Sequence, residues 1–458
     1  MEERQGRAPP EGMSQTAGGR SKEPRIPERA GDRVGLSWKP GAILRYGLLL
    51  VIDLALGWGR DIHSSGRARI DPGRPALLVT NHRRDSDGPL VGSLLLHREG
   101  LRFRGPLPHF VAREDLFHRG FLRRYLTSWP GWARELLAPI GPGRLLRGLN
   151  VHPMRRFPEQ TLGEVLADVR AECGDLPLTE VLRPGWVERF RALGPGAEGP
   201  LRVGEALGRR YRPLLDTPFG LRRLTLHGFR RIKPRQRRVV EGQVGEVVAR
   251  LNDGSPVHLV PEGGVSPHGG RTRVREALHR FLAVSDPRTA VLPLGISHDD
   301  LTTGRPRAFL AVGEELSELE GVERREREER VIRAIRARTT VTVSQIAAAR
   351  ILELGSAGSP VTPDGLEAHV RSEAERLGAR GAPLDPLLTD PGARPARVTA
   401  FLRFGERHGL LRPEADGYRI LAGRLAKPDP WRPEGRVPYA ANEYAELLRL
   451  WAGSESGA

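Results

Sequence analysis

Short apolar runs separated by segments with a helical pattern dominate the chain between residues 67 and 317. The runs end in Gly, Pro or polar residues and show little alternation of apolar and polar positions, which is typical of strands buried in a parallel sheet. They are Ala76–Thr80, His109–Ala112, Leu149–His152, Val257–Val260, Ala290–Ile296 and Ala308–Val312. We expect Pro293 to interrupt the strand formed by Ala290–Ile296. Helical patterns such as Leu90–Arg98 and Val239–Leu251 lie between the runs. The sequence therefore predicts an α/β fold with a mostly parallel central sheet flanked by helices.

The N-terminal region divides into a polar segment and an apolar one. Residues 1–39 are rich in Gly, Pro and Arg without apolar periodicity, and we expect a disordered basic tail. Residues 40–62 contain the apolar stretch Ala42–Trp58, with Arg45 and Asp53 inside it. A spanning helix needs about 20 apolar residues and is disfavoured by a central charge. We expect a membrane-associated helix that lies in the plane of the surface; an apolar helix packed on the protein core is the alternative.

The sheet pattern is interrupted by an Arg-rich insertion at about residues 157–256. Within it, Arg209–Arg238 carries eleven basic residues against one acidic residue, Asp216, and so contributes +10 to the net charge of +17. Such a segment is either a solvated surface or a patch that faces an anion, such as a lipid headgroup, a cofactor phosphate or nucleic acid. The concentration of charge favours the patch.

Residues 63–318 thus form one domain with this insertion, and residues 319–458 form a second, mainly helical domain. Its helical patterns are Arg324–Arg338, Ser344–Glu353, Pro363–Leu377 and Arg397–His408. A hairpin is predicted at Leu410–Ile420, with its turn at Asp416-Gly417. Helices followed by a terminal hairpin resemble a winged-helix unit, although the same spacing is common in unrelated helical domains.

Composition gives a weak argument for nucleic acid as a partner. The chain has 73 basic and 56 acidic residues among 458, but only four are Lys, so the Arg content reflects genome base composition as well as selection. Aromatic residues make up only 5%, and there is no zinc-ligand spacing or RNA-binding aromatic motif. The one cysteine, Cys173, excludes an intramolecular disulfide and a multi-Cys metal site, and it fits a reducing compartment. We expect no metal site.

The most informative segment is Leu77–Asp87, in which a predicted buried strand ends at Thr80. His82 follows in the loop, and Asp87 comes five positions later, before Gly88-Pro89. Open α/β sheets bind ligands beyond the carboxyl ends of their strands. A histidine there, oriented by a carboxylate, can act as a general base towards a hydroxyl. In the alternative interpretation, Asp87 only caps a helix that begins before Pro89. The second acidic residue of the loop, Asp85, is interpreted as solvated.

Further motifs follow in an order that resembles the glycerolipid acyltransferase family, whose members acylate glycerol-3-phosphate and lysophosphatidic acid. The family's Asn-His-x4-Asp block is matched in full by Asn81, His82 and Asp87, and its Phe-Val-Ala-Arg stretch by Phe110–Phe117. The other matches are Gly148–Arg156 for the second block, Pro261, Glu262 and Gly263 for the third, and Val291–Gly295 for the fourth. Gly264 and Val265 stand where the family has Thr and Arg.

The resemblance implies an O-acyltransferase of phospholipid biosynthesis. It implies that His82 is the base, that Asp87 orients it, that Arg155 or Arg156 binds an acceptor phosphate, and that Glu262 and Gly263 line the acceptor site. The donor would be acyl-CoA or acyl carrier protein, the acceptor glycerol-3-phosphate or lysophosphatidic acid, and no cofactor would be needed. The expected location is the cytoplasmic face of the cell membrane, on an anionic surface, with the protein peripheral or monotopic.

Two alternatives stay open. The departures at Gly264 and Val265 and the long insertion leave room for another hydroxyl acceptor, such as a glycolipid. A basic nucleic-acid-binding protein is the alternative from another functional class, and it would leave the His82, Asp87 and Pro261–Gly263 motifs without a role.

Overall fold

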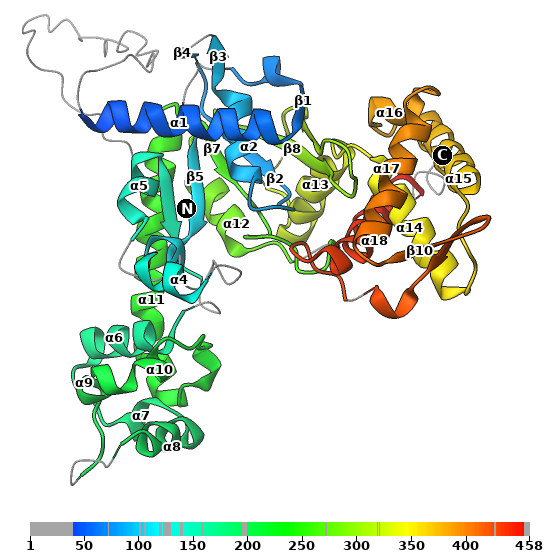
Figure 1. The fold of residues 1–458 in the computed structure, drawn as a ribbon. Coiled ribbons are helices and arrows are strands. Elements are labelled where there is room, and N and C mark those ends of the chain that lie inside the picture. Colours follow the sequence, from blue (N-terminus) through cyan, green and yellow to red (C-terminus); the bar gives the residue numbers. More distant parts are fainter. Residues whose placement is uncertain are drawn as a thin grey trace, which may run out of the picture.

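The computed structural model describes residues 40–71, 73–99, 102–104, 107–118, 121, 130–137, 141–156, 160–194, 199–270, 273–317, 319, 321–425 and 427–452. The tail predicted at residues 1–39 lies outside the described residues. Figure 1 shows three parts: a central sheet with its helices, a helical extension formed by the insertion, and a helical C-terminal part on the other side of the sheet.

The central sheet has seven strands in the order β1-β9-β8-β2-β7-β5-β6. Their bounds are Asp61–Ser65 for β1, Ala76–Thr80 for β2, His109–Arg113 for β5, Val151–Met154 for β6, Val257–Leu259 for β7, Ala290–Asp299 for β8 and Arg307–Val312 for β9. Neighbours run parallel except for β8 and β9. The predicted mostly parallel sheet is confirmed. The interruption expected at Pro293 is wrong: β8 continues through it, and Leu294 is the residue at which β8 passes from β2 to β9.

Helices cover both faces of the sheet because alternate side chains of each strand point to opposite sides. Ala76 and Leu78 of β2 pack in the cluster that contains α2 (Asp87–Leu95), and α1 (Pro40–Gly59) lies against it. Leu77 and Val79 face the other cluster, with α12 (Glu276–Val284), α13 (Arg324–Ala337) and the C-terminal half of α11 (Leu226–Asn252). Smaller elements at the margins are β3 (His97–Glu99), β4 (Arg102–Arg104), α4 (Gly131–Leu137) and α5 (Gly143–Gly148).

The insertion is a helical unit with a core of its own. Its helices are α6 (Leu162–Cys173), α7 (Leu178–Val181), α8 (Pro184–Ala192), α9 (Val203–Ala206) and α10 (Arg212–Leu215). Phe190, Tyr211 and Phe219 are buried in this core together with Ile232 from α11. The 27-residue α11 then continues through Pro234 into the core of the sheet, where Val247 and Leu251 are buried. One helix therefore belongs to both cores.

The C-terminal part consists of α14 (Val343–Ser356), α15 (Pro363–Ala379), α16 (Pro386–Thr389), α17 (Arg394–Arg407), the hairpin of β10 (Leu411–Glu414) and β11 (Gly417–Ile420), and α18 (Pro433–Ala452). The predicted hairpin is confirmed. Val361 forms an antiparallel bridge to Tyr418. A helix, a short extended segment, further helices and a hairpin thus follow each other in the order that the sequence analysis compared with a winged-helix unit.

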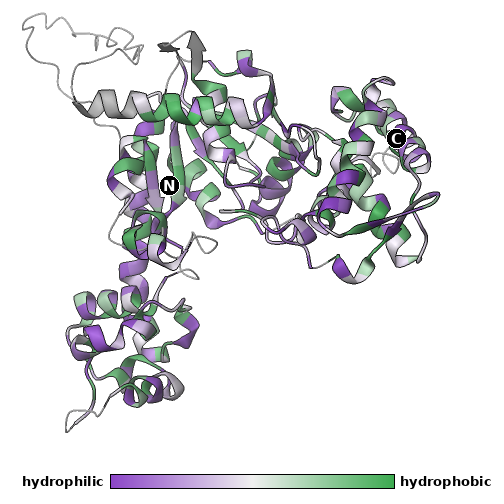
Figure 2. Ribbon diagram, viewed as in Figure 1, coloured by the Kyte–Doolittle hydropathy of each residue, from purple (hydrophilic) through white to green (hydrophobic). Residues whose placement is uncertain are grey.

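The apolar helix α1 turns its acidic residue towards the protein. Asp53 accepts a hydrogen bond from Ser93 Oγ of α2 at 3.1 Å. Val51, Leu54 and Trp58 are exposed, Trp58 to 89%, and Figure 2 shows that the described part of the helix is largely hydrophobic. Among the described helices, α1 included, none combines the length and hydropathy that a membrane crossing requires.

Candidate active site

The carboxyl ends of the parallel strands bring the predicted motifs to one edge of the sheet. The loop after β2 carries Asn81 and His82, and it is fixed to β8 by the Asn81 side chain. Asn81 Nδ2 donates to the carbonyl oxygen of Ile296 at 2.7 Å, and the N–H of Ile296 donates to Asn81 Oδ1 at 2.8 Å. Asn81 thus makes the pair of bonds that a neighbouring strand would make, which holds His82 in place where β2 ends.

His82 and Asp87 form the pair that the sequence predicts. His82 Nδ1 lies 3.0 Å from Asp87 Oδ2. The same oxygen accepts the backbone N–H groups of Arg83 at 2.6 Å and of Arg84 at 2.9 Å. Both of these residues precede α2, and Ser86 occupies the N-cap position. The alternative in which Asp87 only caps the helix is therefore wrong, because the carboxylate organises the loop around His82.

A second histidine, His298 of β8, reaches the other oxygen of the same carboxylate. His298 Nε2 lies 2.7 Å from Asp87 Oδ1, and both side chains are almost completely buried. Burial alone would raise the pKa of Asp87, but the charge and hydrogen bond of His298, and then those of His82, hold it well below its usual range. An ionised carboxylate only accepts hydrogen bonds, so both histidines donate to it. The sequence analysis did not identify His298.

A third histidine, His258 of β7, completes the surroundings of His82. Its Nε2 lies 2.8 Å from Thr80 Oγ1, and its ring meets Phe110 edge-on with centroids 5.5 Å apart. Burial, followed by the charge of His82, lowers the pKa of His258 to about 3. His258 is therefore neutral at physiological pH. The one signal in the sequence was a polar residue inside an apolar strand, which must find a partner when buried.

His82 lies on the wall of a cavity of about 1220 Å³. Apolar side chains of α1, β5 and α5 and of the residues that directly follow α2 and α5 line one region of it: Leu49, Ile52, Leu96, Phe110, Leu146 and Leu149. Basic side chains line another: Arg156, Lys233, Arg237, Arg273, Arg280 and Arg324. Because Nδ1 of His82 is held by Asp87, Nε2 is the ring nitrogen left to meet a ligand. The cavity can therefore hold an amphipathic, anionic molecule against a histidine base.

The structure distinguishes the two arginines that follow β6. Arg155 donates to Glu114 at 2.7 Å and to Asp168 of α6 at 2.8 Å, so it joins the sheet to the insertion. Both arginines line the cavity, and Arg156 lies beside the loop that follows β7. A Cβ atom at Gly264 would come within 3.0 Å of Arg156 Nη1. Gly in place of a larger residue at 264 thus leaves the space that this guanidinium fills.

The two predicted residues of the third block differ in position. Gly263 lines the cavity and has φ of 80°, a conformation that favours glycine. Glu262 is buried, and its carbonyl oxygen accepts a hydrogen bond from Arg275 Nε at 3.3 Å. Burial lowers the pKa of Arg83, but the negative charges of Glu443 and Glu262, among others, more than compensate and raise it. Glu262 therefore supports the loop of His82 electrostatically.

Helix α18 of the C-terminal part holds both loops of the site. Arg436 forms an ion pair with Asp300 at 2.5 Å, and Asp300 pairs with Arg84 at 3.1 Å. The Arg84 guanidinium also lies 5.0 Å from the centre of the Tyr439 ring. In the loop after β7, the carbonyl oxygen of His268 accepts a hydrogen bond from Asn442 Nδ2 at 2.8 Å. The sequence analysis placed no part of the site in this region.

The second carboxylate of the loop, Asp85, lies near the C-terminal part of the chain. Asp85 is exposed, as expected, but its Oδ2 accepts a hydrogen bond from Trp431 Nε1 at 3.1 Å. Within the described ranges, no three His, Cys, Asp or Glu side chains are arranged to hold a metal ion.

The chain was compared with protein-family models, curated proteins and solved structures. No family model matches the chain, and no curated protein matches it. Among solved structures, the chain is similar to the 1-acyl-sn-glycerophosphate (LPA) acyltransferase PlsC from Thermotoga maritima. The TM-score is 0.31 and the identity 16%, over 64% of this chain and 78% of that one. A likeness of this size carries no argument about activity, which has to rest on the site itself.

Proposed function

We propose that the protein is an O-acyltransferase that moves a fatty acyl group from a thioester to a hydroxyl group of a glycerolipid precursor. The observation that carries the proposal is the His82–Asp87 pair, whose histidine lies on the wall of a cavity that is apolar in one region and basic in another. Acyl-CoA or acyl carrier protein is the donor, and glycerol-3-phosphate or lysophosphatidic acid is the acceptor. Phospholipid biosynthesis is the process that the reaction serves.

The chemistry needs a base, because an alcohol with a pKa near that of water, about 16, does not attack a thioester unaided. Nε2 of His82 takes the proton of the acceptor hydroxyl as its oxygen forms a bond to the thioester carbon. The carbon–sulfur bond then breaks, and the thiolate leaves with the proton that His82 carried. Asp87 holds Nδ1–H and stabilises the imidazolium between these steps. Neither a covalent acyl-enzyme nor a metal ion is part of this sequence.

The two regions of the cavity divide the substrates between them. The acyl chain lies among the apolar side chains near α1 and α2, which removes its methylene groups from water at about 0.8 kcal/mol each. The acceptor phosphate binds Arg156, because a guanidinium can donate two parallel hydrogen bonds to a phosphate. Arg155 also lines the cavity, but its guanidinium is held by Glu114 and Asp168.

Helix α1 brings this cavity to its lipid substrates. Its exposed stripe of Val51, Leu54 and Trp58 repeats at helical spacing, while Leu49 and Ile52 line the cavity. We propose that the stripe lies in the surface of the cell membrane on its cytoplasmic side, as a peripheral or monotopic attachment. The basic residues of 209–238 add attraction to anionic lipids.

The decisive experiment is an acyl-transfer assay with purified protein, both donors and a panel of hydroxyl acceptors that includes a glycolipid. We expect transfer to a phosphorylated acceptor, and a loss of at least the roughly 10²–10⁴-fold of general-base catalysis in His82→Ala. Asp87→Asn should also be strongly impaired, whereas Asp85→Asn, a matched carboxylate of the same loop, should be nearly silent. A folded and fully active His82→Ala protein would refute the mechanism. Transfer to the glycolipid alone would show that the acceptor is a glycolipid and not a phosphorylated glycerol or lysolipid.

A further inference from the structure

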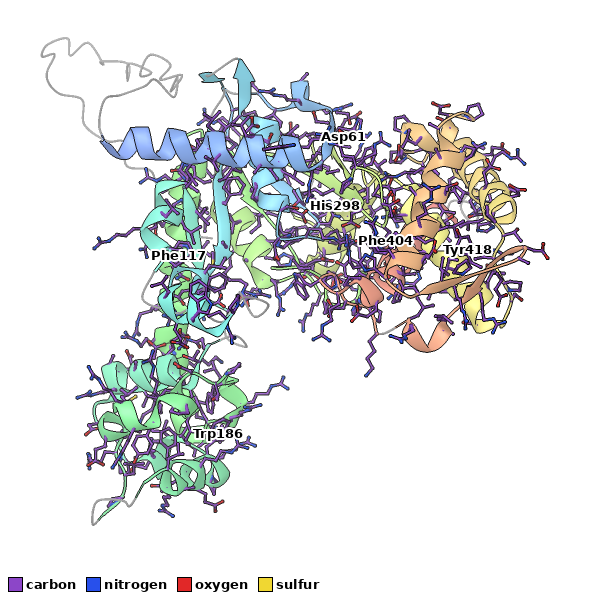
Figure 3. All side chains as sticks on the ribbon, in the orientation of Figure 1. Asp61, Phe117, Trp186, His298, Phe404 and Tyr418 are labelled. Carbon is purple, nitrogen blue, oxygen red and sulfur yellow. The ribbon has the colours of Figure 1, made fainter. Side chains whose placement is uncertain are left out.

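His298 takes no part in the reaction as described so far, yet it is bound directly to the catalytic pair. It comes from β8, whereas His82 and Asp87 belong to the loop after β2, so the contact joins residues 211 positions apart. In Figure 3 the labelled His298 lies in the central part of the molecule, between the insertion with Trp186 and the C-terminal part with Phe404 and Tyr418. Among the described residues that line the cavity, His298 is absent.

The hydrogen-bond arrangement defines how the His298 ring meets Asp87. Nε2 donates to Asp87 Oδ1, while Nδ1 is buried with no hydrogen-bond partner among the described residues. The ring therefore acts on the carboxylate through its Nε2–H.

The carboxylate of Asp87 is thereby shared between two imidazoles. Oδ2 is engaged by His82 and by the N–H groups of Arg83 and Arg84, whereas the one donor that the structure gives to Oδ1 is His298. Without the hydrogen bond from His298, Oδ1 would be a buried acceptor left unsatisfied. The Asp87 carboxylate would then bind the proton on His82 more tightly.

We propose that His298 is a positioning residue of the catalytic pair: its Nε2–H fixes the Asp87 carboxylate and shares its negative charge, and so keeps His82 basic enough to take a proton but able to release it. The inference rests on the proposed function, and it adds a residue to that function's machinery. His298 acts through Asp87 and touches neither substrate.

The other ionisable groups around the pair belong to three elements. His258 of β7 acts on His82 and is neutral, since burial lowers its pKa to about 3. Asp300 follows β8 and is compensated by Arg84 and by Arg436 of α18. None of these ionisable side chains hydrogen-bonds to Asp87 within the described chain, so the effect of altering His298 passes through Asp87.

Two substitutions that differ only in reach test this role. His298→Gln places its amide nitrogen near the position of Nε2 and keeps the bond to Asp87, whereas the shorter amide of His298→Asn cannot reach. Ser297→Ala is the matched control, since Ser297 is a neighbouring buried residue of β8 whose side chain points to the other face of the sheet. Melting temperatures establish that all three proteins are folded.

The first measurement is the pH dependence of kcat/KM for acyl transfer. We expect His298→Asn to lower kcat about tenfold with both KM values unchanged, the size of effect known for outer partners of functional histidines. We also expect the acidic limb of its pH profile to move upwards by about one pH unit. His298→Gln should stay close to wild type, and Ser297→Ala should not differ from it.

The second measurement needs no substrate. The rate at which diethyl pyrocarbonate modifies His82, followed by peptide mass spectrometry from pH 5 to 8, reports the protonation of that ring. Its midpoint should rise in His298→Asn and not in His298→Gln. Equal midpoints in wild type and His298→Asn would overturn the inference even if the proposed acyl transfer is confirmed. Conversely, a shifted midpoint in a protein that acylates no acceptor would support the positioning role and refute the proposed function.

Discussion

At the residue scale, the site is organised around one buried carboxylate. Asp87 accepts two backbone N–H groups and two imidazole N–H groups, and each of its oxygens therefore has a defined direction. This places the two histidines in different roles: His82 faces the cavity, and His298 is enclosed. The chemistry proposed for the loop depends on this difference in exposure as much as on residue type.

The neighbouring arginines Arg155 and Arg156 should respond differently to replacement by Ala. Arg156→Ala should raise the acceptor KM about ten- to a hundredfold, since a charge-assisted contact is worth roughly 1.5–3 kcal/mol. Arg155→Ala should lower the stability instead, by roughly 1–3 kcal/mol, because Glu114 and Asp168 lose their shared partner while Asp168 keeps Arg235. Acceptor kinetics beside thermal melting distinguish them, and the reverse pattern would show that Arg155 binds the phosphate.

The neutral His258 should make the protein sensitive to acid. In the unfolded chain this residue binds a proton below about pH 6.5, whereas in the folded protein its pKa is lowered to about 3. The unfolded state therefore holds more protons between these values, and each unit of falling pH should cost up to about 1.4 kcal/mol of stability. His258→Gln should flatten the dependence of melting temperature on pH in this window. An unchanged slope would contradict the neutral assignment.

The sequence was sufficient for the residues that lie close together along the chain. Asn81, His82 and Asp87 lie between the end of β2 and the start of α2, and their position after a predicted strand, their spacing and the family resemblance together predicted the pair. His298 and His258 reach the same site from β8 and β7, and contacts across strands leave no local pattern in a single sequence. For the same reason the sequence left Arg155 and Arg156 as alternatives, since their partners lie on other elements.

At the element scale, the apolar runs predicted most strands well because burial on both faces removes polar residues from a parallel strand. The edge strand β1 reads DIHSS, and its polar composition gave no such signal. Helix α11 was predicted only from residue 239, because its first half is rich in arginine and lies in the insertion. In both segments polar residues outnumber apolar ones, so the apolar periodicity is weak.

The stripe on α1 should determine membrane attachment. Replacing Val51, Leu54 and Trp58 together by Gln removes apolar surface without adding charge or a poor helix former, and each of these side chains stands on the exposed side of α1. Flotation with vesicles of phosphatidylcholine and phosphatidylglycerol should fall strongly. Val284→Gln, the same kind of change at an exposed apolar residue of α12, is the control. If the triple variant floats like wild type, α1 is not the membrane contact.

At the scale of the whole molecule, the C-terminal part contacts the loop of His82 through α18. Arg436 and Tyr439 hold the loop of His82 through Asp300 and Arg84, so the order of that loop depends on a helix more than 340 residues further along the chain. The pattern of the sequence predicted helices in this region but could not reveal this contact, because it depends on how residues from distant parts of the chain meet.

Replacing Arg436 should therefore lower turnover, although Arg436 is not among the described residues that line the cavity. In Arg436→Gln, Asp300 keeps Arg84 but loses its second cation, and we expect kcat to fall about tenfold, since a misplacement of about 1 Å can cost a hundredfold. Arg449→Gln removes an exposed arginine of the same helix and should be silent. Steady-state kinetics of both variants provide the comparison. Equal turnover would show that α18 covers the loop without ordering it.

The shared helix α11 has a consequence for how the molecule melts. At 1.5 Å per residue its 27 residues span about 40 Å, enough to form a wall of the insertion and then a wall of the sheet. A unit attached by a flexible linker would melt on its own, whereas two cores that share a continuous helix lose it together. Calorimetry should accordingly record the insertion and the sheet as one cooperative transition. A heat-labile insertion that unfolds first would show that the helix breaks at Pro234.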